Sequence, residues 1–311
     1  MMGKATRDAY GEALKELGAV YPDLVVLDAD LSASTKTQDF AKVYPERFFD
    51  CGIAEGNMMS VAAGLAAAGK IPFASTFAIF GAGRAYEQIR NSICYPNLNV
   101  KVALTHAGLT VGEDGATHQM LEDIALMRVL PNMTVIVPAD AAETRAAVRW
   151  AAAHHGPVYI RMGRAKCDDI TDPEAVFTPG KAAVLRKGYD ITIMACGIMT
   201  AKALAAADIL KGAGITARVI NMSSIKPIDE ETIIKAAAET GAIVTAEEHS
   251  VRGGLGSAVA EVVVKHAPVP MAMIGVEDRF GESGKADDLL KAYGLTAAHI
   301  AETALRLYKR K

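Results

Sequence analysis

Glu55 lies where the sequence changes from a short apolar stretch to a longer helical one. Phe48 and Phe49 precede it and are typical of a short buried strand, whereas the apolar residues from Gly56 to Gly69 recur as in a buried helix. A first-turn glutamate that interacts with the helix dipole would explain this position. Acid–base chemistry is the alternative, because an isolated buried carboxylate is costly and perturbed carboxylates gather at functional sites.

A second group of reactive side chains lies in the Gly-rich stretch 105–119, which contains His106, His118, Glu113 and Asp114. Histidine suits proton transfer because it can donate to an oxyanion and accept a hydroxyl proton near neutral pH. Two histidines and two acids would also suit a metal ion, but they lack the tight ligand spacing that zinc sites use. We therefore predict no metal site in this loop.

Two phenylalanines, Phe77 and Phe80, directly follow the apolar stretch 71–75. Aromatic residues three apart at the end of a strand are ordinarily part of the core. Their faces can also pack a planar ring of a ligand, because offset stacking contributes about 1 kcal/mol beyond burial. The sequence leaves both interpretations open at this point.

The elements that must position these residues alternate between strand and helix. In the first half we expect strands at 24–27, 71–75, 100–105, 133–137 and 158–160, and helices at 5–20, 82–93, 121–130 and 141–154. After an irregular stretch, 166–185, a second series has strands at 191–195, 217–222, 243–247 and 271–274, and helices at 200–211, 230–239 and 254–264. This pattern predicts an α/β protein with two domains, each a mostly parallel sheet covered by helices. Ligands bind such sheets beyond the carboxyl ends of the strands, where most of the residues above lie.

Bulk composition narrows the function further. The chain has 311 residues, of which 51% are hydrophobic, and its net charge is −3. It therefore has no basic surface for nucleic acid or for an anionic membrane. Its four cysteines form no Cys-x-x-Cys pair, so neither a zinc site nor a disulfide framework is expected. Reduced thiols, and the absence of an apolar signal or spanning segment, predict a cytoplasmic location.

The sequence Gly-Ile-Ala-Glu-Gly-Asn-Met at 52–58 resembles the pyrimidine-binding domain of the transketolase family of thiamine-diphosphate enzymes. The resemblance implies that Glu55 hydrogen-bonds N1′ of the aminopyrimidine, favouring the tautomer that deprotonates the thiazolium. It also implies that Phe80 stacks on the cofactor, with Phe77 beside it. The family commonly has tyrosine where this chain has Gly83, which predicts a more open pocket or one filled by a partner.

The loop ending Gly-Glu-Asp-Gly-Ala-Thr-His-Gln at 112–119 resembles the transketolase signature. This match implies that His106 and His118 contact the substrate oxygens on C1 and C3, and that Asp114 contacts the hydroxyl on C2 or the next carbon. A related synthase family that makes deoxyxylulose phosphate shares part of the motif, so the motif indicates the superfamily better than the reaction.

Three further matches imply a site for the substrate phosphate. Arg7, Ser34 and Arg164 correspond to family residues that hold the sugar phosphate, with Arg161 as a runner-up to Arg164. Arginine is the expected type because its planar guanidinium binds phosphate with two hydrogen bonds. Asp30 is predicted to lie near the thiazolium or the partner chain.

The resemblance covers the last two of three transketolase domains. We assign residues 1–165 to the pyrimidine-binding domain, 166–185 to a linker and 186–311 to the C-terminal domain. The Gly-Asp-Gly…Asn motif that holds magnesium and diphosphate in the family is missing, and no other phosphate-binding motif replaces it. We therefore predict a split transketolase subunit that transfers two-carbon ketol units between sugar phosphates. Its partner would be a separate diphosphate-binding subunit that holds Mg²⁺ or a similar ion, in an α2β2 complex with this chain as the homodimer.

Alternatives remain at this stage. A deoxyxylulose-phosphate-synthase-like subunit or the β subunit of a 2-oxoacid dehydrogenase would have a similar plan, although the latter usually lacks the Thr-His-Gln ending. A non-catalytic homologue is the third alternative. In the second domain, His249 and Arg252 precede a Gly-rich helix start that could suit an anion; we interpret them as structural or interfacial.

Overall fold

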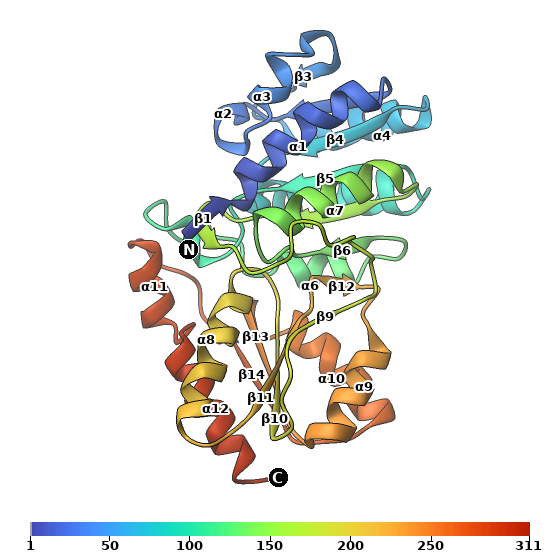
Figure 1. Cartoon of the computed structure of the whole chain (residues 1–311). Coiled ribbons are helices and arrows are strands. Elements are labelled where there is room, and N and C mark those ends of the chain that lie inside the picture. The colour runs from blue at the N-terminus through green and yellow to red at the C-terminus, as the bar shows by residue number, and fades with distance from the viewer. Residues whose placement is uncertain (1) are drawn as a thin grey trace.

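The computed structural model describes residues 2–311 as two α/β domains, one above the other in Figure 1. The upper domain holds the N-terminal half of the chain and the lower domain the C-terminal half. Among these residues no helix combines the length and apolarity that a bilayer span requires.

The first domain is built on a seven-stranded sheet in the order β12-β6-β7-β5-β4-β2-β3. All of its pairs are parallel except that of β12 with β6. The strands are β2 (Leu24–Asp28), β3 (Phe48–Asp50), β4 (Ile71–Ser75), β5 (Lys101–Leu104), β6 (Thr134–Ile136), β7 (Val158–Arg161) and β12 (Ser224–Lys226). The helical segments are α1 (Thr6–Val20), α2 (Ser32–Thr35), α3 (Gln38–Ala41), η1 (Pro45–Arg47), α4 (Glu55–Ala67), η2 (Ile79–Arg84), α5 (Tyr86–Gln88), η3 (Ile89–Cys94), η4 (Leu109–Val111), α6 (Asp123–Arg128) and α7 (Ala141–Ala153).

Alternate residues of the central strands enter two different cores. Leu24 and Val26 face a core that also contains residues of α1 and α7, whereas Val25 and Leu27 face the core of α4. This alternation follows from the two-residue period of a strand, and it explains why a strand covered on both faces is apolar throughout.

The second domain has a five-stranded sheet in the order β14-β13-β10-β11-β9, with only β9 antiparallel. Its strands are β9 (Ala183–Arg186), β10 (Ile191–Ala195), β11 (Ala217–Asn221), β13 (Ile243–Ser250) and β14 (Met271–Val276). Its helices are α8 (Met199–Gly212), α9 (Glu230–Thr240), α10 (Leu255–His266), α11 (Ala286–Ala292) and α12 (Ala297–Tyr308). A separate pair, β1 (Met2–Ala5) with β8 (Lys166–Asp168), joins the start of the chain to the segment after β7.

The predicted fold class is confirmed, but several local predictions are wrong. The segment 166–185 is not irregular throughout, since it contains β8 and the beginning of β9. The helix expected at 82–93 is split into the π-helical segments η2 and η3 around α5. The strand at Phe48 and Phe49 exists, yet Phe49 is 40% exposed because β3 lies at the edge of the sheet. The proposed domain limits stay a prediction.

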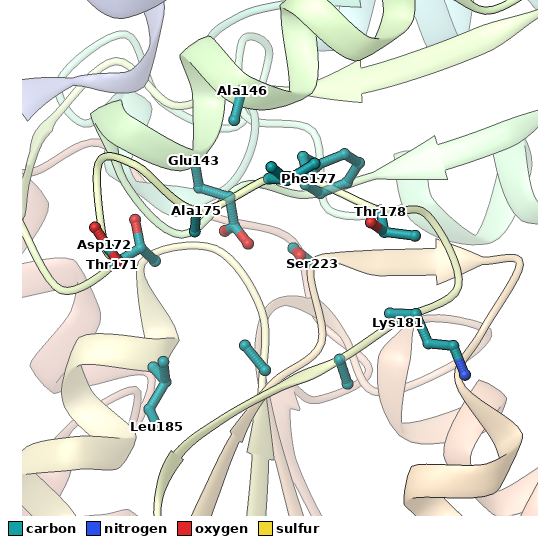
Figure 2. A pocket seen from close by; sticks show the side chains of 13 residues that line it. Glu143, Ala146, Thr171, Asp172, Ala175, Phe177, Thr178, Lys181, Leu185 and Ser223 are labelled. Carbon is teal, nitrogen blue, oxygen red and sulfur yellow. The ribbon is translucent and has the colours of Figure 1, made fainter.

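One of the hydrophobic cores extends across both domains, and hydrogen bonds also join the domains. β12 leaves the second domain to pair with β6, and the core of α4 continues into α9 and α10. A cavity of about 270 Å³ lies at this junction, and Figure 2 shows Glu143, Phe177 and Ser223 around it. The Glu143 carboxylate already accepts hydrogen bonds from Asn221 Nδ2 and the Ala139 N–H. None of the predicted site residues lines this cavity.

Candidate functional site

Five parallel strands bring the predicted site residues to one edge of the first sheet. These strands lie in the sheet in the order β7, β5, β4, β2 and β3. The segments that follow them contain, respectively, Arg164, His106, Phe77, Ser34 and Glu55. Since the carboxyl ends of parallel strands meet at one edge, residues far apart in the sequence lie close together there. The predicted common location is therefore explained by the sheet topology.

Glu55 is the first residue of α4 and is 3% exposed. Its Oε1 accepts a 2.9 Å hydrogen bond from Arg84 Nη1, which makes the pair a salt bridge. Arg84 is a residue that the sequence analysis missed. The sequence does contain a signal for this contact. A buried carboxylate requires a partner, and Arg84 is the first basic residue after the two phenylalanines.

Four rings form an aromatic cluster beside Glu55. Phe77 and Phe80 stack with centroids 5.7 Å apart and planes inclined by 14°. The His106 ring stacks on Phe77 at 3.7 Å, and the His118 ring meets Phe80 edge-on at 5.4 Å. Gly83 is exposed, and a Cβ there would meet only Ile79, at 3.8 Å. The cluster thus presents aromatic surface next to a carboxylate.

His106 is held in one orientation by two hydrogen bonds. Its Nε2 accepts from Arg7 Nη1 at 3.2 Å, so in the neutral ring the proton lies on Nδ1, which donates to Thr105 Oγ1 at 2.8 Å. Burial, followed by the positive charges of Arg7 and Arg164, lowers the pKa of His106 to about 3. Its backbone has φ = 58°, a strained conformation for a non-glycine residue. His106 is therefore a neutral imidazole near pH 7.

The signature loop presents Asp114 and His118 toward solvent. His118 Nδ1 is 3.0 Å from Thr117 Oγ1. Asp114 is half-exposed and lies 3.8 Å from Arg164 Nη1, and the same Nη1 donates to the Val111 carbonyl. These side chains are accessible to a ligand while the loop backbone beneath them is fixed.

Arg7 and Arg164 line a cavity of about 320 Å³. Arg7 Nη1 also donates to the Ser34 carbonyl at 3.0 Å, which brings α1 and α2 together. Within the described residues, Arg7 Nε is buried and has no hydrogen-bond partner. Lys285, which the sequence analysis did not consider, lines the same cavity. A buried donor without a partner beside two further cations is suited to an anion.

Arg161 is not available as the alternative to Arg164. It is 6% exposed and makes two hydrogen bonds to Asp123, from Nε at 2.6 Å and from Nη2 at 3.2 Å. Its Nη2 also donates to the Glu248 carbonyl, at 2.9 Å. Asp30 is exposed with φ = 60°, and its N–H donates to the Asp50 carboxylate; its predicted role stays a prediction.

A loop of the second domain packs directly on the signature loop, which the sequence did not reveal. Gln119 Nε2 donates to the Glu282 carbonyl at 2.9 Å. A Cβ at Gly115 would lie 2.4 Å from Ser283 Oγ, and one at Gly281 would lie 1.8 Å from Gln119 Oε1. The glycines therefore allow this close contact, since a side chain at either position would require Ser283 or Gln119 to move.

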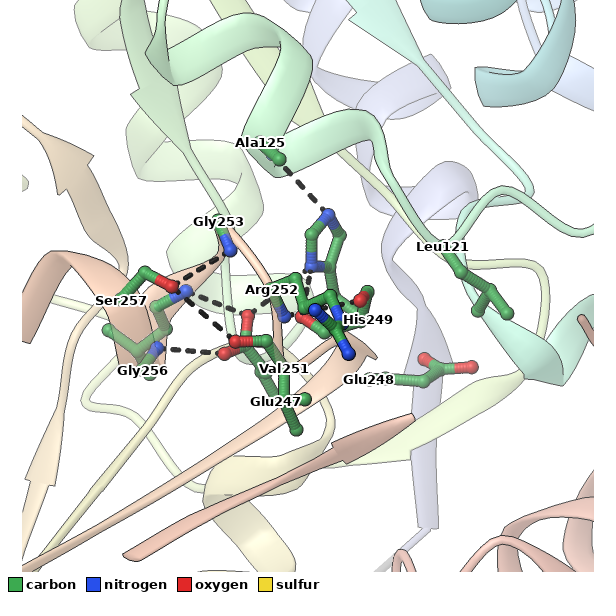
Figure 3. Close-up of polar contacts among 12 residues, drawn as sticks. Leu121, Ala125, Glu247, Glu248, His249, Val251, Arg252, Gly253, Gly256 and Ser257 are labelled. Carbon is green, nitrogen blue, oxygen red and sulfur yellow. Dashed lines mark hydrogen bonds and ion pairs between the residues drawn. The ribbon is translucent and has the colours of Figure 1, made fainter. Parts of the chain in front are cut away.

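The Gly-rich helix start in the second domain is already filled by the chain itself. The Glu247 carboxylate accepts from the N–H groups of Leu255 and Gly256, at 2.7 and 2.8 Å. Figure 3 shows the contact with Gly256. His249 is buried beside it, donates from Nδ1 to the Ser250 carbonyl and accepts at Nε2 from the Ala125 N–H. This geometry supports a structural interpretation of His249 and leaves no place for an external anion.

Comparison with known proteins identifies the family. The transketolase pyrimidine-binding domain model matches residues 2–168, and the transketolase C-terminal domain model matches residues 180–300. The chain is 52% identical to a putative transketolase C-terminal section of Methanocaldococcus jannaschii, over 99% of this chain and 98% of the relative. It is 47% identical to a 6-deoxy-6-sulfo-D-fructose transketolase subunit of a Clostridium species, over 98% and 95%. A solved split-gene transketolase, described as an inactive β4 tetramer, superimposes with a TM-score of 0.93 at 60% identity and covers 99% of both chains.

The chain belongs to the transketolase family, as the fold and both domain matches establish. Within this family it corresponds to the C-terminal section of a split transketolase, because it spans nearly the whole length of relatives of that kind. A split transketolase implies an N-terminal partner subunit, and membership of the family implies a general dependence on thiamine diphosphate.

The described residues fit one half of that cofactor. The buried Glu55 carboxylate beside two stacked phenylalanines suits a planar ring that carries hydrogen-bond donors. Residues 2–311 contain no group of three or more His, Cys, Asp or Glu side chains that could hold a metal ion.

Proposed function

We propose that this chain is the pyrimidine-binding and substrate-contacting subunit of a thiamine-diphosphate-dependent transketolase. It would transfer a two-carbon ketol unit between sugar phosphates, and only together with a subunit that holds the diphosphate and its metal ion. The observation that carries the proposal is the buried Glu55 carboxylate beside the Phe77–Phe80 stack, with two histidine rings against the same aromatics.

Each residue has a chemical task in this proposal. Glu55 shares a proton with N1′ of the aminopyrimidine, while Phe80 and Phe77 pack against the ring. When bound, thiamine diphosphate supplies the carbon nucleophile and the electron sink. His106 is neutral, so its ring orients sugar oxygens without adding charge, and the more exposed His118 is accessible for proton transfer.

The arginine side chains beside His106 indicate the class of substrate that we propose. Arg7 and Arg164 line the same cavity, and within the part of the chain that the structure describes the buried Arg7 Nε has no hydrogen-bond partner. We assign this cavity to the anionic end of the sugar. A phosphate is the expected group, and a sulfonate is the alternative because one relative is described as a 6-deoxy-6-sulfo-D-fructose transketolase subunit.

The proposed assembly is an α2β2 complex in which two copies of this chain pair with two partners. Ile53, which is 76% exposed, and Val61 lie on the solvent side of the α4 region, where an apolar contact would bury them. Closed two-fold pairing is the commonest arrangement for such contacts. The related β4 tetramer supports self-association of such chains without a partner.

Co-purification of the chain with its partner, followed by an assay of donor-ketose cleavage, tests the proposal. In that complex, Glu55→Gln should slow hydrogen–deuterium exchange at cofactor C2 by on the order of two decades, the usual contribution of a positioned acid–base group. Glu87→Gln, which changes an exposed acid of α5, is the matched control and should leave exchange unchanged. Wild-type-like exchange in Glu55→Gln would remove Glu55 from this role. Tight stoichiometric binding of thiamine diphosphate and magnesium by the chain alone, seen by calorimetry, would contradict the split arrangement.

A further inference from the structure

The partner of Glu55 is a guanidinium that covers the same surface a cofactor ring would use. Arg84 Nη1 donates to Glu55 Oε1 at 2.9 Å, and the Arg84 guanidinium carbon lies 4.5 Å from the centroid of the Phe80 ring. One planar cationic group thus engages both the carboxylate and the aromatic face. These are the two features to which the proposed function assigns the aminopyrimidine.

We propose that Arg84 occupies the place of the aminopyrimidine in the free chain and must swing away before the cofactor can bind. The guanidinium is a close chemical substitute, because it is flat, donates hydrogen bonds along its edge and stacks through its face. This inference rests on the proposed function, since it presupposes that Glu55 and Phe80 bind that ring.

The two occupants exclude each other on geometric grounds. Glu55 is 3% exposed, so few directions remain from which a donor can reach Oε1, and Arg84 uses one of them. The guanidinium also lies over the ring of Phe80. A ring stacked on Phe80 and bonded to Glu55 would require the same space.

Burial explains why the chain carries such a substitute. A carboxylate buried without a partner costs far more free energy than one that is paired, and the free chain has no cofactor to pair with it. Arg84 supplies the missing charge and donor. It stabilises the free subunit, and it lowers the apparent cofactor affinity by the fraction of chains in which Glu55 is blocked.

The side chain of Arg84 has open space on its solvent side. It is 55% exposed, so the guanidinium can turn outward into water. The backbone of the preceding turn packs closely on β5, since a Cβ at Gly81 would lie 2.5 Å from the side chain of Leu104. Displacement therefore needs only rotation of the Arg84 side chain and no refolding of η2.

Thiamine is a suitable probe, because it carries the pyrimidine without the diphosphate that the partner would hold. We expect Arg84→Met to bind thiamine about threefold to tenfold more tightly than the wild-type free chain, as removal of a partly exposed ion pair implies. Arg84→Lys should lie closer to wild type, since it keeps the charge but loses the flat stacking group. Arg90→Met, at an exposed arginine of η3, is the matched control and should not change binding.

Two further measurements do not depend on activity. In the wild-type chain, the NMR signal of the Arg84 side-chain N–H should move toward its solvent position as thiamine is added. Without ligand, Arg84→Met should lower Tm in the wild-type background but much less in the Glu55→Gln background, where no charge is left unpaired.

The outcomes separate this inference from the proposed function. If wild type binds thiamine and Arg84→Met binds it equally or more weakly, the Arg84 inference is overturned while the proposed function stands. If no variant binds thiamine, and the co-purified complex does not bind thiamine diphosphate, the proposed function fails and the Arg84 inference fails with it. Tighter binding by Arg84→Met together with an unchanged control supports both.

Discussion

Replacement of Arg7 by methionine should raise the pKa of the His106 imidazole by about one unit. Arg7 Nη1 is 3.2 Å from His106 Nε2, and two full charges at that distance in an effective dielectric of about 20 would repel by about 5 kcal/mol. The guanidinium charge is spread over three nitrogens and is partly exposed to water. We therefore expect about a quarter of that value, or about one pKa unit.

Titration of the ring nitrogens by long-range ¹H–¹⁵N NMR, from pH 3 to 8, measures this change. Wild type should keep a neutral His106 ring with its proton on Nδ1 over most of that range, because the pKa is lowered to about 3. Arg149→Met, which removes an exposed arginine of α7 paired with Glu16, is the matched control and should leave the His106 titration unchanged. An unchanged pKa in Arg7→Met would refute the Arg7 contact, and a rise above the ordinary value of about 6.5 would refute burial as the main cause.

The same shift sets a direction for stability against pH. The folded pKa of His106 lies below the unfolded value, so the unfolded chain binds more protons between about pH 3 and 6.5. The free energy of unfolding should therefore fall as pH is lowered through this window, by roughly 4 to 5 kcal/mol in total from this group. Denaturant unfolding at several pH values should show a smaller fall in Arg7→Met than in wild type.

Three further predictions concern the anion site, the domain junction and the assembly. Arg164→Ala should raise KM for phosphorylated donors by about tenfold or more, as loss of a charge-assisted hydrogen bond implies, and far less for unphosphorylated ones; equal effects on both would assign Arg164 to structure. Arg161→Met should lower the free energy of unfolding by about 3 to 5 kcal/mol, because it leaves the buried Asp123 carboxylate without its cation. The Tyr159 hydroxyl also donates to Asp123, at 2.6 Å, and a loss below about 1 kcal/mol in urea unfolding would show that this hydrogen bond suffices. Light scattering should show self-association of the free chain at micromolar concentration, and Ile53→Asp should weaken it; a wild-type monomer, with a complex of one chain of each kind, would exclude the α2β2 assembly.

Much of the fold could be predicted from the sequence because its determinants are local. Continuous apolar stretches such as 24–27 and 191–195 indicate parallel strands covered on both faces, and the helices between them show a clear period. Local patterns carried less information where the chain departs from regular geometry. The π-helical turns that split the helix predicted at 82–93 have no distinctive sequence period, and β12 belongs to a sheet whose other strands come from the first domain.

By itself, the sequence determined which types of side chain form the site and at which edge of the first sheet they meet. Glu55, the phenylalanine pair and the histidines of the signature loop follow strands, and parallel strands place such residues at a common edge. Only the tertiary structure decided which side chains pair there. It placed Arg161 on buried Asp123, Arg7 on His106 and Arg84 on Glu55. The reason is physical: an arginine side chain can reach partners in many directions, and the partner it takes depends on burial and on charges brought near by distant parts of the chain.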